Sequence, residues 1–176
     1  RCSPLLFPIV GNCRNNKTII EGKTYCIEKH GFCRDVDFQV TRQSDTAVTF
    51  EIHDTEETKA VYPYSFSLSL TYVMENGMLS MEYRVANTDD RTIYYCIGAH
   101  PGFNCPMEEG ASFNDYELVF EEDETVSSMV YDLENLQFDP SHRIPRLDHS
   151  RRLPLTREMF KDDAVYFDDL KSRKVS

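Results

Sequence analysis

Two of the five histidines lie in glycine-containing turns beside predicted strands, where an imidazole could carry out acid–base chemistry. His30 lies in "EKHGFCRD" (28–35) and His100 lies in "CIGAHPGFNCP" (96–106). The neighbouring glycines permit unusual backbone angles or a close ligand approach, and Pro101 stiffens the second turn. With an unperturbed pKa of about 6.5, histidine can give or take a proton near neutral pH. Taken singly, either ring could instead serve in a buried hydrogen-bond network.

The other three histidines are interpreted as exposed surface residues. His53 ends an alternating strand on its polar phase. His142 and His149 lie in the polar, proline-containing segment 139–152, which is predicted to be a surface loop.

Alternation of apolar and polar residues predicts an antiparallel, all-β chain. Residues 66–87 are expected to form a hairpin, because Asn76-Gly77 is the dipeptide favoured in a type I′ turn. One face of its first strand is predicted to carry Phe66, Leu68, Leu70, Tyr72 and Met74. Further strands are predicted at 23–27, 36–43, 47–53, 91–97, 116–120 and 127–133, and "LPLTREMF" as a short helical turn. Many short strands favour a sandwich or barrel, organised as one domain over 1–176.

Composition excludes several partners and cofactors. The net charge of −11, with 30 acidic residues against 19 basic ones, disfavours nucleic acid and an anionic membrane surface. No apolar run is long enough for a transmembrane helix, and no signal-peptide pattern opens the chain. The six cysteines form no CxxC pair, so most are expected to be free thiols of a cytoplasmic protein, without zinc. No metal, nucleotide or redox cofactor is predicted, because GxGxxG, P-loop and HExxH motifs are missing.

Two local patterns have alternative interpretations. The acidic run "EEDET" (121–125) lacks the spacing of a calcium loop and is predicted to be a solvated hairpin turn. Cys33 and Cys105 flank the two histidine turns, so a Cys–His nucleophilic pair is conceivable, but a lowered thiol pKa would be needed.

Three sequence blocks together resemble a known family. The blocks "LFPIVG" (6–11), "HGFCRD" (30–35) and "GAHPGF" (98–103), in this order and with hairpin strands between the last two, resemble the aldose 1-epimerase (galactose mutarotase) family. The resemblance spans nearly the whole chain. It implies a large antiparallel β-sandwich with the sugar in a cleft across one face. The chain is expected to be a fragment of this fold that lacks N- and C-terminal strands.

The resemblance also implies roles for individual residues. His100 matches the catalytic histidine that protonates the ring oxygen, and His30 matches the second active-site histidine, which binds sugar hydroxyls. Arg34 matches an arginine lining the pocket, which helps to hold the phosphate in relatives that act on hexose phosphates. Asp163 resembles the substrate-binding aspartate of the family, although Asp162 is an equally near match.

The implied reaction is interconversion of the α and β anomers of a hexose or hexose phosphate. Acid and base groups open the ring, and no cofactor is needed beyond the small-molecule sugar. The general base of the family is a glutamate in a late "EPW" block, expected outside this segment. A non-catalytic carbohydrate-binding or sugar-sensing protein of the same fold is the alternative. A purely structural β-sandwich domain would require His30 and His100 to lie far apart.

Overall fold

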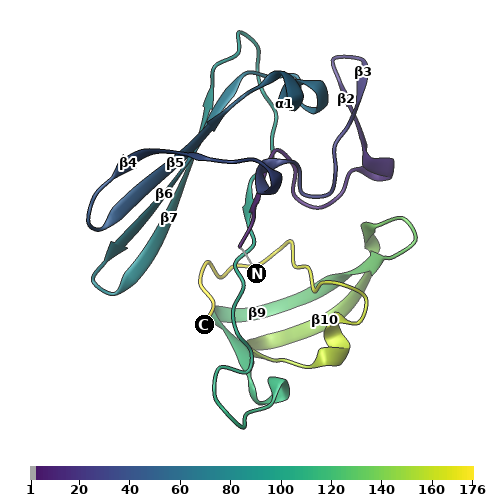
Figure 1. Cartoon of the computed structure of the whole chain (residues 1–176). Helices are drawn as coiled ribbons and strands as arrows, with labels where there is room; N and C mark the ends of the chain where they lie inside the picture. Colours follow the sequence, from purple (N-terminus) through teal and green to yellow (C-terminus); the bar gives the residue numbers. More distant parts are fainter. Residues whose placement is uncertain (1–2) are drawn as a thin grey trace. The chain divides into compact units, whose positions relative to one another are not determined.

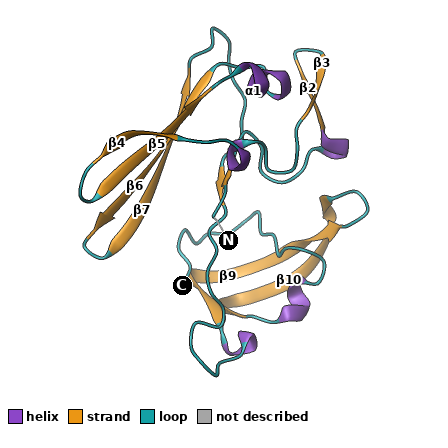
Figure 2. Ribbon diagram, viewed as in Figure 1, coloured by secondary structure: helices purple, strands orange, loops and turns teal. Residues whose placement is uncertain are grey.

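The computed structural model describes residues 3–176, and antiparallel strands dominate it (Figures 1 and 2). The chain divides into two compact units, residues 1–101 and 102–176, and each is described by itself. The predicted all-β class is confirmed. The expectation of a single domain over 1–176 stays a prediction.

The first unit is built on a four-stranded antiparallel sheet in which sequence neighbours are also neighbours in space (Figure 1). Its strands are β4 (Gln39–Gln43), β5 (Ala47–His53), β6 (Phe66–Glu75) and β7 (Met78–Asn87). The only α-helix among residues 3–176, α1 (Glu56–Val61), connects β5 to β6. Thr55 and Thr58 form a capping box at its start, which satisfies backbone N–H groups that the helix leaves unpaired.

The predicted hairpin 66–87 is confirmed. Asn76 and Gly77 have φ angles of 53° and 74°, the left-handed values that a type I′ turn requires at both central positions. Burial along β6 is uneven, because Phe66 and Leu68 are completely buried whereas Met74 is 62% exposed. The apolar face that the alternation predicts is therefore covered only at the end where β6 begins.

Phe7 lies at the centre of the core of the first unit. Its completely buried ring lies 5.1 Å from that of Phe66 and 5.8 Å from that of Tyr62, measured between centroids. Phe7 directly follows β1 (Leu5–Leu6), which pairs with the short strand β8 (Gly98–Ala99). The segment "LFPIVG" is thus anchored in the core. Its position also fixes that of Gly98 and Ala99, which pair with β1.

Residues 17–26 form a second, smaller hairpin. It consists of β2 (Lys17–Ile20), which the sequence patterns did not predict, and β3 (Lys23–Cys26). The predicted strand 91–97 is wrong, because this segment is held by single contacts instead of a ladder. The Cys96 N–H donates to the Pro8 carbonyl at 2.8 Å, and the Tyr94 carbonyl accepts from the Tyr62 hydroxyl at 3.0 Å.

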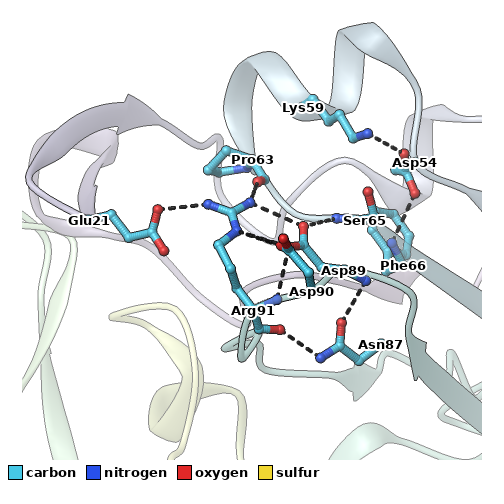
Figure 3. A network of polar contacts seen from close by, with 10 residues as sticks. All are labelled: Glu21, Asp54, Lys59, Pro63, Ser65, Phe66, Asn87, Asp89, Asp90 and Arg91. Atoms are coloured by element: carbon cyan, nitrogen blue, oxygen red, sulfur yellow. Dashed lines mark hydrogen bonds and ion pairs between the residues drawn. The ribbon is translucent and has the colours of Figure 1, made fainter.

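A polar network centred on Arg91 holds the turn that follows β7 (Figure 3). The Arg91 guanidinium donates to the carboxylates of Asp89 and Glu21 and to the Pro63 carbonyl. Asp89 in turn accepts the Ser65 N–H at 2.8 Å. The network joins the ends of β6 and β7 to the turn between β2 and β3.

The second unit is dominated by one long antiparallel pair, β9 (Glu117–Asp132) and β10 (Gln137–Pro154). The predicted strands 116–120 and 127–133 lie within β9 except for their outer residues, Tyr116 and Leu133. The surface loop predicted at 139–152 is wrong, because this segment belongs to β10 and pairs through several register shifts. Bulges of this kind accommodate proline and charged side chains in a strand.

The hairpin turn predicted at 121–125 is also wrong, since these residues lie inside β9. Glu124 is only 1% exposed, and its carboxylate accepts the backbone N–H groups of Lys171 and Ser172. The acidic run therefore contributes a structural contact. The described residues, 3–176, also form four short 3-10 helices: η1 (Arg14–Asn16), η2 (Cys33–Asp35), η3 (Phe113–Asp115) and η4 (Arg157–Phe160). η4 confirms the helical turn predicted in "LPLTREMF" for its last four residues, whereas its first two residues end β10.

The prediction that most cysteines are free thiols is confirmed for the described residues. The free thiols are Cys13, Cys26, Cys33, Cys96 and Cys105, while Cys2 lies outside the described part of the chain. Among residues 3–176, no helix combines the length and apolar character needed to cross a membrane. The cytoplasmic location stays a prediction.

Candidate active site

The three sequence blocks meet along the segment that begins with β1. Leu5 and Leu6 pair with Ala99 and Gly98, immediately before His100. The next residue, Phe7, forms a parallel bridge with Gly31. One short segment therefore contacts both histidine-containing turns.

Gly31 is required by the closeness of this approach. The Phe7 carbonyl accepts the N–H groups of Phe32 at 3.1 Å and Cys33 at 3.4 Å. A Cβ atom on Gly31 would lie 2.1 Å from the Phe7 carbonyl oxygen, and Gly31 has a φ of 73°. His30 shares the left-handed conformation, with a φ of 72°, which is uncommon for a residue with a side chain.

Two hydrogen bonds join His30 to Gly11, the last residue of "LFPIVG". The Gly11 N–H donates to Nδ1 of His30 at 3.0 Å, and the His30 N–H donates to the Gly11 carbonyl at 2.8 Å. His30 is half-buried. The imidazole is thus held by a main-chain N–H, which has less conformational freedom than a side-chain partner would have.

His30 and His100 lie together although they are far apart in the sequence. Their ring centroids are 6.0 Å apart, with an interplanar angle of 69°. His100 is exposed and directly follows β8. The arrangement expected for a purely structural domain, with these two rings far apart, is therefore excluded.

Arg34 lies four residues after His30, in η2. It is exposed, and its Nε lies 3.4 Å from a carboxylate oxygen of Asp35. An exposed ion pair of this kind contributes little to stability. Arg34 is therefore available to bind a ligand, and its place in the pocket stays a prediction.

Asp163 belongs to the second unit, where it follows η4. It is exposed, like Asp162, and has a φ of 92°. The structure brings His30 and His100 together within the first unit, whereas the roles of Asp163 and Asp162 in the pocket stay predictions.

Three cavities of about 300 to 470 Å³ in the first unit are lined by residues other than these histidines. One of the two 470 Å³ cavities is lined in part by Tyr62, Tyr64 and Arg91. The Arg91 guanidinium lies 5.1 Å from the centre of the Tyr64 ring and is already bonded to two carboxylates. These contacts give Arg91 a structural role in the wall of this cavity.

The Cys–His alternative is not favoured. Burial raises the pKa of the Cys33 thiol to about 12, so that it is protonated at neutral pH. Cys105 belongs to the second unit. Within residues 3–176, no group of three or more His, Cys, Asp or Glu side chains is arranged to hold a metal ion.

Gly11 is a site residue to which the sequence patterns gave no role. Its block was recognised as part of the resemblance. A backbone N–H that binds an imidazole cannot be identified from the residue type, because almost every residue has such a group. The only signal in the sequence is the glycine itself, a residue type that the φ of 80° in the structure favours.

A sequence profile of the aldose 1-epimerase family matches residues 2–174. The chain belongs to this family. It is 36% identical over 180 residues to the LacX proteins, plasmid and chromosomal, of Lactococcus lactis subsp. lactis. This match covers 99% of the chain and 60% of each relative.

Two solved structures are also similar. A galactose mutarotase related enzyme from Lactobacillus acidophilus superposes on 98% of the chain with a TM-score of 0.88 and 33% identity. A galactose mutarotase-like protein from Lactobacillus casei superposes on 94% with a TM-score of 0.81 and 33% identity. The predicted mutarotase-like fold is confirmed. The chain spans 56% of the length of each of these two structures.

Proposed function

We propose that the protein is an aldose 1-epimerase that interconverts the α and β anomers of a hexose or a hexose phosphate. Family membership supports a reaction of the sugar-epimerase type. The observation that carries the specific proposal is the 6.0 Å separation of the His30 and His100 rings, which come from different segments. Two imidazoles at this distance can contact one bound sugar ring from two sides.

The proposed chemistry requires one proton to leave the anomeric hydroxyl and another to reach the ring oxygen. His100 supplies the proton to the ring oxygen, and the C1–O5 bond then breaks to give the open aldehyde. Rotation about C1–C2 and reclosure give the other anomer. Histidine suits the role of acid because its ordinary pKa is close to neutral pH.

The remaining roles in the proposal are those of binding and of the base. His30 binds sugar hydroxyls, while Arg34 and Asp163 contact the substrate. The base is proposed to be a carboxylate in the part of the relatives' length that the chain does not span. The overall reaction is an isomerisation without a change of oxidation state, so it needs no redox cofactor.

Substitution of His100 tests the proposal. We expect His100→Asn to lower kcat by about 10²- to 10⁴-fold, the usual loss when a general acid is removed, with a smaller effect on binding. Anomer exchange should be followed by NMR or optical rotation with glucose, galactose and their 6-phosphates, using the full-length protein. His142→Asn, an exposed position on β10, is the matched control and should retain activity.

Two outcomes would contradict the proposal. Anomer exchange no faster than in buffer, in a wild-type protein that binds the sugar, would favour the non-catalytic sugar-binding alternative. A His100→Asn variant with wild-type kcat would remove His100 from the mechanism.

A further inference from the structure

The two ring nitrogens of His30 are not equivalent. Nδ1 accepts a hydrogen bond from the Gly11 N–H at 3.0 Å. A backbone N–H can only donate, so Nδ1 must present its lone pair to Gly11. In a neutral imidazole the single ring proton is then on Nε2.

We infer that Gly11, through its backbone amide, holds His30 as the Nε2–H tautomer, so that His30 donates a hydrogen bond to an oxygen of the bound sugar and transfers no proton. Gly11 is then a positioning residue, because it acts through His30. The tautomer is independent of the ligand, whereas the role of His30 toward the sugar rests on the proposed function.

The same bond opposes a doubly protonated His30. A proton on Nδ1 would point at the Gly11 N–H, and two donors would face each other across 3.0 Å. The second bond of the pair, from the His30 N–H to the Gly11 carbonyl, keeps the two residues in register. Gly11 and His30 both have left-handed φ angles, of 80° and 72°, so this pair of hydrogen bonds depends on a particular backbone conformation at both residues.

The hydrogen bond from Gly11 gives His30 a role different from that of His100. The positions of the two rings alone do not distinguish their roles. Either imidazole of a pair with centroids 6.0 Å apart could in principle be the acid. Because "LFPIVG" pairs with β8 through Leu6 and binds His30 through Gly11, one segment positions both rings. The restriction on His30 leaves proton transfer to His100.

Nitrogen NMR of the imidazoles tests the tautomer directly. In ¹⁵N-labelled protein at neutral pH, we expect His30 to show an unprotonated Nδ1, a protonated Nε2, and a through-hydrogen-bond coupling between Nδ1 and the Gly11 amide nitrogen. His149 is an internal comparison, since its Nδ1 lies 2.7 Å from an Asp148 carboxylate oxygen, which favours a proton on that nitrogen. A protonated Nδ1 in His30 would overturn the inference.

A pair of substitutions tests the role toward the sugar. His30→Asn places an acceptor near the position of Nδ1 but removes the Nε2–H donor, so we expect near wild-type thermal stability and a KM about 10-fold higher. His30→Gln can place an N–H donor near Nε2 but loses the Gly11 bond, so we expect lower stability and a smaller increase in KM. His142→Asn is the control for the exchange of an exposed histidine.

The pH profile separates a donor of hydrogen bonds from a donor of protons. The kcat profile of His30→Asn should keep the alkaline limb that deprotonation of the general acid produces. Loss of this limb, or an unchanged KM in His30→Asn, would overturn the assigned role of His30. Failure of the wild-type protein to exchange anomers would defeat the proposed function, and with it the sugar-binding role, while the NMR spectrum would still decide the tautomer.

Discussion

The backbone around Gly31 leaves no room for a side chain. We expect Gly31→Ala to lower the free energy of unfolding by about 2–5 kcal/mol, combining left-handed strain with overpacking against the Phe7 carbonyl. Gly22→Ala is the matched control, because Gly22 has a similar φ of 80° with nothing within 4 Å of the added Cβ. It should cost only about 1–2 kcal/mol of strain. Equal losses in urea denaturation would show that contact with Phe7 is unimportant.

At this scale, the sequence predicts side-chain chemistry better than main-chain chemistry. His30 and His100 could be singled out from their glycine-containing turns and from the resemblance, and the structure brings their rings together. The contribution of Gly11 could not be predicted, because it depends on a backbone N–H that every non-proline residue has. The direction of that N–H depends on tertiary contacts, here the second bond from the His30 N–H to the Gly11 carbonyl.

At the scale of elements, the hydrogen bonds of the Arg91 network connect the start of β6 and the end of β7 to the turn between β2 and β3 (Figure 3). The Arg91 guanidinium and the Ser65 N–H hold the pKa of Asp89 well below its usual range. A carboxylate with a depressed pKa stabilises the folded state at every pH above its unfolded pKa of about 3.9. This contribution is lost as the pH falls through the lower pKa of the folded state.

Asp89→Asn should therefore lower the denaturant midpoint at pH 7, and its difference from wild type should shrink as the pH falls below about 4. Asp90→Asn is the control, because the side chain of Asp90 is 95% exposed and that of Asp89 only 8%. Denaturant titrations at pH 7, 4 and 3 measure both variants. A difference that stays constant over this range would contradict the role of the Asp89 charge.

One hairpin could be predicted from the sequence, whereas two other segments could not. The hairpin 66–87 could be predicted because alternation and the Asn-Gly turn agree. The segment 91–97 has residues typical of a strand but finds no ladder, since its contacts go to Pro8 and Tyr62. The segment 139–152 has the composition of a loop, yet pairing with β9 through register shifts makes it a strand. In both cases the segment that lies beside these residues decides the outcome, and the composition of the segment alone does not.

For the whole molecule, charge bears on the choice of substrate. The net charge of −11 opposes the approach of an anionic sugar phosphate. At physiological ionic strength the Debye length is about 8 Å, so distant charges are largely screened. A cation in contact with the ligand therefore has the larger effect on the affinity for the phosphate. Arg34, exposed four residues after His30, is a candidate for this cation. A phosphorylated substrate would need such a local charge more than a neutral hexose would.

We therefore expect Arg34→Ala to raise KM for a hexose 6-phosphate by about 10-fold and for the free hexose by less than about 2-fold, since hydrogen bonds to charged groups contribute about 1.5–3 kcal/mol. Arg42→Ala, at an exposed position of β4, removes the same charge elsewhere in the first unit and should change neither KM. Anomer exchange of both sugars at fixed ionic strength measures the difference. Equal changes for the two sugars would assign Arg34 to the neutral part of the substrate, and a loss in Arg42→Ala would mean that net charge, and not a local contact, controls selection of the phosphate.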